Sequence, residues 1–302
     1  MSAIVRTVAG DVEPGELGPC DAHEHLFLDT PLQPGDCFGE LEPAIEEART
    51  LAAAGARSLV EWTPLGLGRS LDGLLAVSEA TGLHVVAATG LHRDAHYPPG
   101  HPLRAESEEA LADRFTADVA GGAIRCGIVK LGGSYHVVTP FEAKAFAAGA
   151  EAHRRTGAPV CVHAEHGTNG SGIVARLTGL GVPAASIVLA HVDRNPDAGE
   201  HADTAASGCW LQLDGPGRQK YWPDSTILQL IADLAERGLA GQLLLGSDTG
   251  RRSSFRAYGG GPGLDYLFAR FKPRLERELG AELARRLLVE NPARAFAFEP
   301  RA

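Results

Sequence analysis

The sequence has few of the features that mark a secreted, membrane-bound or nucleic-acid-binding protein. Its five cysteines are odd in number and scattered, with no Cys-x-x-Cys spacing, which disfavours a disulfide framework and a zinc finger. No run of about 20 apolar residues occurs, so we expect no membrane partner. The first eleven residues hold one arginine and do not resemble a signal peptide. We therefore expect a cytoplasmic protein with free thiols at Cys20, Cys37, Cys126, Cys161 and Cys209.

A strongly basic charge balance is also missing. The formal net charge is −10, so no basic surface for a nucleic acid is expected. Local lysines and arginines can still hold an anionic small molecule. The expected partner is therefore a small-molecule substrate.

Short apolar runs instead alternate with helical patterns along the whole chain. The runs are nearly continuous, as in IVLAH and LLLGSD, which is typical of parallel strands buried on both faces. We expect eight strands, at Cys20–Leu26, Arg57–Thr63, Leu83–Thr89, Cys126–Leu131, Ala158–His163, Ser186–His191, Gly208–Leu213 and Gln242–Asp248. Helices are expected at Leu41–Ala54, Leu71–Ala80, Glu106–Ala120, Phe141–Thr156, Asp224–Arg237 and Asp265–Leu279.

This alternation predicts one α/β domain over residues 1–302, folded as a (β/α)8 TIM barrel. The alternative is an open, doubly wound sheet of eight strands. No Gly-x-Gly-x-x-Gly motif follows the first strand, which disfavours the dinucleotide-binding form of that alternative.

Candidate metal ligands lie at the ends of five of these strands. They are His23 and His25 in DAHEHL, Lys130 in GIVKLGG, His163 in VCVHAEHG, His191 in IVLAHVD and Asp248 in LLLGSDTG. Two histidines spaced i, i+2 on a strand point to one face, and a barrel builds its active site at the carboxyl ends of its strands. Each residue alone has a structural explanation, such as core packing, an ion pair for the lysine or a helix N-cap for the aspartate. Together they predict a metal site.

The ordered set of motifs resembles the phosphotriesterase family of the amidohydrolase superfamily. The resemblance covers nearly the whole chain. Its motifs are HEHL (23–26), VAATGLH (86–92), GIVKLGG (127–133), PVCVHAE (159–165), LAHVDRN (189–195), GSDTGRR (246–252) and LLVENPARAF (287–296).

This resemblance implies two divalent metal ions, zinc first, with manganese or cobalt as alternatives. In the family pattern, His23, His25 and Asp248 hold the more buried ion, and His163 and His191 hold the more exposed one. Carbamylated Lys130 bridges the two ions, and hydroxide between them is the nucleophile. Asp248 accepts or relays the proton and is the catalytic residue. By analogy with the family, we also expect a homodimer.

The loops after the last two strands are rich in basic residues, which suit a phosphate or carboxylate. Lys220 and Arg251 resemble the phosphate-binding pair of family members that open phosphorylated furanose lactones. Those members place a tyrosine three residues after the arginine, whereas this chain has Ser254. After the third predicted strand, Tyr97 is the candidate aromatic hydroxyl near the metals, with His92 as a second candidate.

Three functions follow as hypotheses. The first is a zinc-dependent hydrolase acting on ester bonds that opens a lactone, specifically a phosphorylated or otherwise anionic sugar lactone. The second is a phosphotriesterase acting on organophosphate triesters, which needs a larger and more apolar pocket. The third is a metal-containing binding protein without turnover, which the presence of both Lys130 and Asp248 disfavours.

Overall fold

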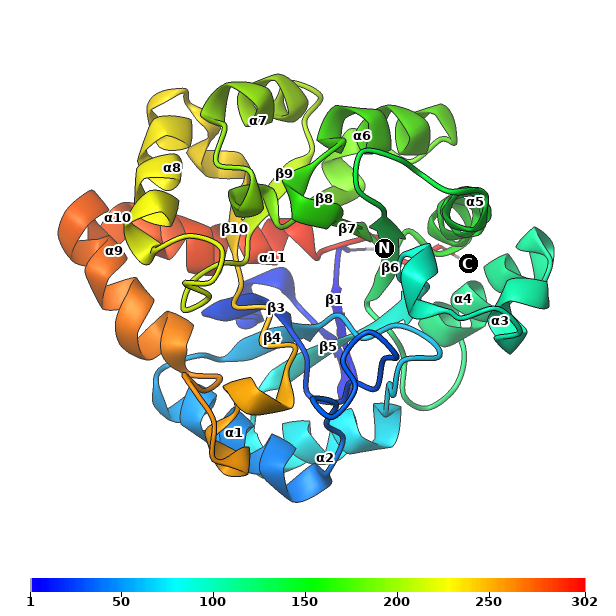
Figure 1. Cartoon of the computed structure of the whole chain (residues 1–302), viewed down its shortest axis with the longest axis horizontal. Coiled ribbons are helices and arrows are strands. Elements are labelled where there is room, and N and C mark those ends of the chain that lie inside the picture. The colour runs from blue at the N-terminus through cyan, green and yellow to red at the C-terminus, as the bar shows by residue number, and fades with distance from the viewer. Residues whose placement is uncertain (1, 302) are drawn as a thin grey trace.

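The eight predicted strands form one parallel sheet that curves into a barrel surrounded by helices (Figure 1). In this computed structural model, which describes residues 2–301, neighbouring strands follow the chain order from β3 to β10. The strands are β3 Cys20–Glu24, β4 Ser58–Glu61, β5 His84–Gly90, β6 Ile128–Gly133, β7 Val160–Ala164, β8 Ile187–Ala190, β9 Trp210–Leu213 and β10 Leu243–Leu245. Just beyond β10, the Asp248 N–H donates to the His23 carbonyl at 2.9 Å, which joins the last strand to the first. The predicted (β/α)8 TIM barrel is confirmed, and the open sheet is excluded.

Side chains along each strand point alternately into the barrel and out toward the helices, which divides the core into two layers. Cys20 and Ala22, Val86 and Ala88, and their counterparts fill the barrel interior, together with Trp62. The residues between them pack outward against the helices. Every second side chain of a strand points inward, so Lys130 faces the interior like Ile128 two residues before it. In the same way, His163 follows inward-facing Cys161 at the end of its strand. The position of these two ligands thus follows from strand geometry.

The outer layer consists of helices that follow the strands. They are α1 Leu41–Ala53, α2 Leu71–Thr81, α3 Pro102–Ala105, α4 Glu108–Ala120, α5 Pro140–Thr156, α6 Gly170–Gly179, α7 Ala198–Ala205, α8 Asp224–Glu236, α9 Lys272–Leu279, α10 Ala281–Arg285 and α11 Asn291–Ala295. A capping box between Thr139 and Glu142 begins α5, and Gly157 in left-handed backbone ends it. The helix predicted at Asp265–Leu279 is interrupted, since a π-helical turn at Leu267–Phe271 precedes α9.

A short hairpin that was not predicted closes the amino-terminal end of the barrel. It pairs β1 Val5–Thr7 with β2 Gly10–Val12, and Val8 N–H donates to the Val85 carbonyl at 2.9 Å. The opposite, carboxyl-terminal end is therefore the open one, where the long loops gather.

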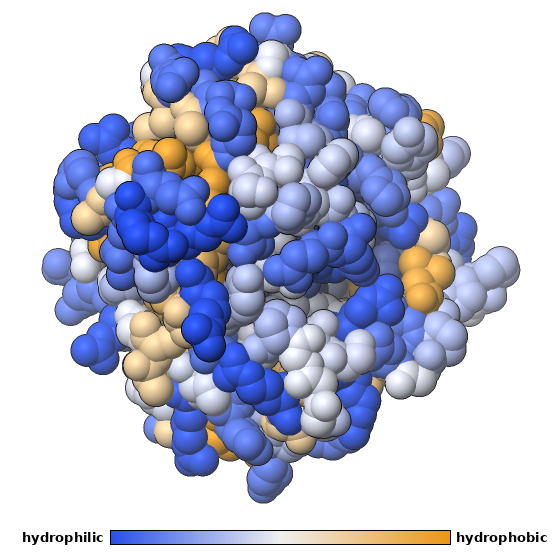
Figure 2. Space-filling model, turned by 60° about the vertical axis from the view of Figure 1, so that its left-hand side comes forward, coloured by the Kyte–Doolittle hydropathy of each residue, from blue (hydrophilic) through white to orange (hydrophobic). Residues whose placement is uncertain are grey.

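The surface is predominantly polar. Figure 2 shows mostly hydrophilic residues on the face in view, with hydrophobic colour in separate patches. Among residues 2–301, no helix has the length and apolar character needed to cross a membrane. The cysteines in this range are all free.

Candidate metal centre and active site

The predicted metal ligands come together in one cavity at the carboxyl end of the barrel. The cavity has a volume of about 250 Å³. Its lining includes the buried side chains of His23, His25, Lys130, His163, His191 and Asp248. Five strands therefore deliver side chains to a single point, as the spacing along the sequence predicts.

Three of the strand ends depart from regular geometry to aim their ligands. The pairing of β3 with β4 shifts between Asp21 and Glu24, so His23 faces the interior directly after inward-facing Ala22. His191 and Asp248 have φ values of 68° and 49°, in the left-handed region that non-glycine residues rarely adopt. Backbone strain at these positions turns the side chains into the cavity.

The ligand atoms fall into two groups. His25 Nε2 and His23 Nε2 lie 3.3 and 3.7 Å from Asp248 Oδ1. On the other side, His163 Nδ1 and His191 Nε2 are 2.8 Å apart. Two imidazole nitrogens at this distance need a proton or a cation between them. The grouping matches the division of ligands between two ions that the family resemblance implies.

The nitrogens on the far side of the rings contact other polar groups. His25 Nδ1 bonds Thr63 Oγ1 at 2.8 Å, and Thr63 in turn donates to Glu61. His163 Nε2 lies 2.5 Å from Glu165 Oε2. Such partners fix the tautomer and orientation of a metal-binding histidine and leave its other nitrogen free for the ion.

Asp214 provides this contact for ligands of both groups. Its Oδ2 lies 3.0 Å from His191 Nδ1 and 3.4 Å from His23 Nδ1, and it accepts from the His191 N–H at 2.8 Å. A Cβ on Gly246 would lie 2.7 Å from Asp214 Oδ1, so glycine leaves room for this carboxylate. One donor atom from each of His23, His191 and Asp214 lies within 4.8 Å of the other two. Because Asp214 faces the Nδ1 atoms, away from the cavity, we interpret it as orienting the ligands.

We expect Asp214→Asn to weaken metal binding by roughly 10- to 100-fold, the usual effect of losing such a partner. Metal content after dialysis against a graded chelator series measures this effect. Asp193→Asn is the matched control, since Asp193 is equally buried and accepts from the Asp214 N–H at 2.7 Å. Equal metal retention in the two variants would contradict the role given to Asp214.

Several buried atoms at the centre lack hydrogen-bond partners. Those that face the cavity are the Nε2 of His23 and the Nζ of Lys130, whereas the Nδ1 atoms of His23 and His191 lie 3.4 and 3.0 Å from Asp214 Oδ2 without hydrogen-bond geometry. Burial lowers the pKa of His23 and His191 well below the ordinary value, so both rings stay neutral and keep a lone pair. Unpartnered polar atoms this deep are rare in native proteins. Neutral imidazoles and a carboxylate are the donors that divalent metals require, so the residues fit a metal centre.

Lys130 lines the same cavity as the two ligand groups. Burial lowers the pKa of its amine to about 8, although the negative charge of Asp248 acts to raise that pKa. Its Nζ lies 5.2 Å from the centre of the Trp62 ring, which also stacks on His23 at 3.9 Å. The Trp62 side chain therefore faces the barrel interior.

Asp248 is also enclosed by cations. Its Oδ2 accepts from Arg194 Nη2 at 2.6 Å and contacts Arg218. Burial opposes ionisation of Asp248, but the charge of Arg218 and the hydrogen bond from His25 hold its pKa well below the ordinary value. Asp248 is therefore a carboxylate at neutral pH.

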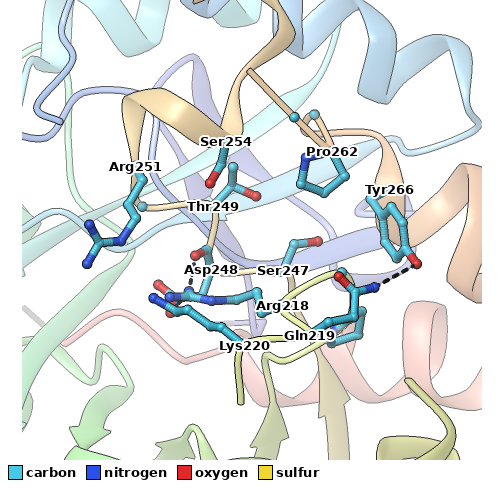
Figure 3. A pocket seen from close by; sticks show the side chains of 15 residues that line it. Arg218, Gln219, Lys220, Ser247, Asp248, Thr249, Arg251, Ser254, Pro262 and Tyr266 are labelled. Atoms are coloured by element: carbon cyan, nitrogen blue, oxygen red, sulfur yellow. Dashed lines mark hydrogen bonds and ion pairs between the residues drawn. The ribbon is translucent and has the colours of Figure 1, made fainter. Parts of the chain in front are cut away.

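The predicted substrate-binding residues differ in where they lie. Lys220 and Arg251 line the catalytic cavity and a second cavity of about 220 Å³ beside it, between the loops after β9 and β10 (Figure 3). Arg251 is 41% exposed at its side chain and pairs with Asp36 at 3.1 Å.

Tyr97 is not among the lining residues of the catalytic cavity. Its hydroxyl donates to the Leu65 carbonyl and accepts from the His92 N–H, both at 2.9 Å. His92 does line the cavity.

Comparison with known proteins agrees with this geometry. The family model described as "Phosphotriesterase family" matches residues 3–296. The chain belongs to the phosphotriesterase family. It is 32% identical to a phosphotriesterase homology protein from Escherichia coli, over 91% of this chain and 96% of that protein. It is 30% identical to a phospho-furanose lactonase from Mycoplasmopsis synoviae, over 97% and 92% of the two chains. The crystal structure of a lactonase from Listeria monocytogenes matches with a TM-score of 0.91 and 27% identity, covering 98% of this chain and 99% of that one.

Family membership establishes a phosphotriesterase-like, metal-dependent hydrolase. The strand-end rule, applied to every strand, would also have found Asp214, which follows β9 directly. Arg194 and Glu165 lie within quoted motifs, but no spacing rule indicates that they line the cavity.

Proposed function

We propose that this phosphotriesterase-family hydrolase is a binuclear metal-dependent lactonase whose substrate carries an anionic group. The observation that supports an anionic substrate is the excess of cationic side chains in the catalytic cavity. Five cationic side chains besides Lys130 line it, against the two carboxylates of Glu165 and Asp248, in a chain of net charge −10. The cations are Arg93, Arg194, Arg218, Lys220 and Arg251.

For the metals, we propose that His23, His25 and Asp248 hold one ion and that His163 and His191 hold the other. Carbamylated Lys130 would join them, and zinc is the proposed metal. The unpartnered, fully buried Nζ supports this proposal, because the reaction of the neutral amine with CO₂ yields a carboxylate and releases one proton. When bound, two such cations polarise an ester carbonyl and lower the pKa of water.

The chain's own residues supply the remaining functions. Asp248 is ionised and faces the cavity, so its carboxylate accepts the proton released when water attacks the ester. Lys220 and Arg251 extend from neighbouring loops after β9 and β10, so both reach one anionic group at the mouth (Figure 3). The phospho-furanose lactonases among the relatives support a phosphorylated sugar lactone as that substrate.

A phosphotriesterase acting on organophosphate triesters is the second candidate, supported by the family name. Its substrates are neutral and largely apolar, and they would gain little from the cations that line this cavity. We therefore rank it below the anionic lactone.

The charge preference gives the test of the proposed substrate. Lys220→Ala and Arg251→Ala should each raise KM for a phosphorylated lactone by about 10-fold or more, the scale of one charge-assisted contact of about 1.5 kcal/mol. The neutral analogue should be nearly unaffected. We expect a smaller effect for Arg251, because Asp36 already neutralises part of its charge.

Arg256→Ala is the matched control, since Arg256 lies in the same loop as Arg251 but pairs with Asp265 and lines neither cavity. Parallel losses on the charged and neutral lactones would overturn the anion site. Hydrolysis of triesters but of no lactone would replace the first candidate by the second.

A further inference from the structure

A groove continues from the catalytic cavity to the surface. Arg93, Glu165, His166 and Arg194 line both spaces, and Tyr135, His136, Thr168 and Asn195 complete the wall of the groove. Its volume is about 640 Å³, against about 250 Å³ for the catalytic cavity. Small-molecule sites usually span about 300–1,000 Å³, so the catalytic cavity alone accommodates little more than the reacting ring. A group in the groove can be covalently attached to one in the cavity.

Aromatic rings form a strip along this passage. Tyr135 meets His166 edge to face, with ring centres 5.8 Å apart, and His166 meets Tyr221 at 6.4 Å. Tyr221 lines the catalytic cavity. Tyr135 is 59% exposed, and a large ring with this exposure is free to contact a ligand.

The backbone holds this wall in an unfavourable conformation. Tyr135 lies at the tip of a turn in which the Val137 N–H donates to the Ser134 carbonyl. His136 in the same turn, and His166 on the other side, both have φ of 55°. Glycine or asparagine adopts this conformation more readily, yet both positions present imidazoles. The His136 N–H donates to Thr168 Oγ1 at 3.0 Å, so the turn is fixed to the opposite wall.

The charges of the groove are already balanced. Arg93 pairs with Glu165 at 3.2 Å, and Arg194 pairs with Asp248 at 2.6 Å. The Thr168 hydroxyl accepts from the His136 N–H and donates to the Glu165 carbonyl, and the Asn195 Nδ2 donates to Glu200 at 2.8 Å. The polar groups left to meet a ligand are the Asn195 Oδ1 and the imidazoles of His136 and His166. This combination suits a neutral ring that carries several hydroxyl groups, with an apolar face against Tyr135 and polar edges toward the other side chains.

We infer that the groove is a subsite for a second sugar ring, attached to the lactone that is opened in the catalytic cavity. This inference rests on the proposed lactonase function and extends it. The substrate class is a lactone of a disaccharide acid, with the reacting ring at the metal centre and the second ring on the Tyr135–His166 wall.

Two lactones with the same reacting ring test the subsite. Glucono-1,5-lactone lacks a second sugar, and cellobiono-1,5-lactone carries one. The wild-type enzyme should have a kcat/KM several-fold higher for the disaccharide lactone. Tyr135→Ala should reduce that advantage by roughly 3- to 10-fold, the scale of one ring contact, and leave the glucono-lactone rate unchanged. Val137→Ala is the control, because Val137 lies in the same turn, is 51% exposed and does not line the groove.

A binding measurement separates this inference from the proposed function. Titration calorimetry with cellobionate and with gluconate requires no turnover. Cellobionate binding that depends on Tyr135 would support the subsite even if no lactone were hydrolysed, in which case only the lactonase proposal would fail. Equal binding of the two acids, or no advantage of the disaccharide lactone, would overturn the subsite. The assignment of the subsite to sugars would be overturned by a different pattern of kcat/KM. In that pattern γ-phenyl-γ-butyrolactone is a better substrate than γ-butyrolactone, but the disaccharide lactone is no better than glucono-lactone.

Discussion

Replacing Lys130 with alanine is expected to lower kcat/KM by roughly 10³-fold and to reduce the metal content of the protein. The physical reason is the loss of the bridging carboxylate proposed at this position. Metal ions supply several kcal/mol of transition-state stabilisation, and each 1.36 kcal/mol corresponds to a factor of ten in rate. Metal analysis together with steady-state kinetics on a lactone measures both effects.

The same site allows two companion measurements. Added propionate should partly restore the activity of Lys130→Ala, because a free carboxylate can occupy the vacated space. Lys130→Met keeps most of the buried side-chain volume, so it should remain folded, stay inactive and show no rescue. A free amine at Lys130 in fully metal-loaded, active protein would falsify the carbamylation, and intact-mass measurement for one added CO₂ under native conditions gives an independent check.

Asp248→Asn should lower kcat by roughly 10²–10⁴-fold, the usual scale for a positioned acid–base group. Asparagine keeps an oxygen for the metal but loses the basicity of the carboxylate. The φ of 49° at this position is one that asparagine tolerates well, so the backbone should not move. The change therefore isolates proton acceptance more cleanly than alanine would.

Metal content must be measured on the same samples. Unchanged turnover with intact metals would remove Asp248 from the proton transfer, and a rate loss that tracks metal loss would assign it to metal binding alone. Asp265→Asn is the matched control, since that carboxylate pairs with Arg256 outside the catalytic cavity. It should keep full activity.

The sequence predicts the barrel well because its strands are uniform. Most of the eight are apolar runs buried on both faces, which is a strong local signal. Elements without that signal were missed. The hairpin Val5–Val12 includes charged residues and three-residue strands, and α6 contains three glycines, at Gly170, Gly172 and Gly179, that hide its helical character.

The sequence predicts that the candidate metal ligands lie close together. It does not predict the neighbouring side chains that hold them in place. Strand ends locate His163 and Lys130 because inward and outward residues alternate. The contacts of Asp214 with His23 and His191 join residues that are far apart in the sequence. Likewise, nothing in the residues around Tyr97 shows that its hydroxyl bonds to the backbone of Leu65 and His92. Such contacts depend on loop conformation, which periodicity does not encode.

The left-handed backbone at His191 and Asp248 has a consequence for directed evolution of this enzyme. Non-glycine residues in this conformation typically destabilise a fold by about 1–3 kcal/mol each. A library screened only for heat resistance of the metal-free protein should therefore enrich glycine or asparagine at these two codons, and the clones selected in this way would have lost most of their activity. Thermostable variants of this barrel have to be obtained by selecting for residual turnover after heating, or by keeping both positions fixed while the surface is diversified.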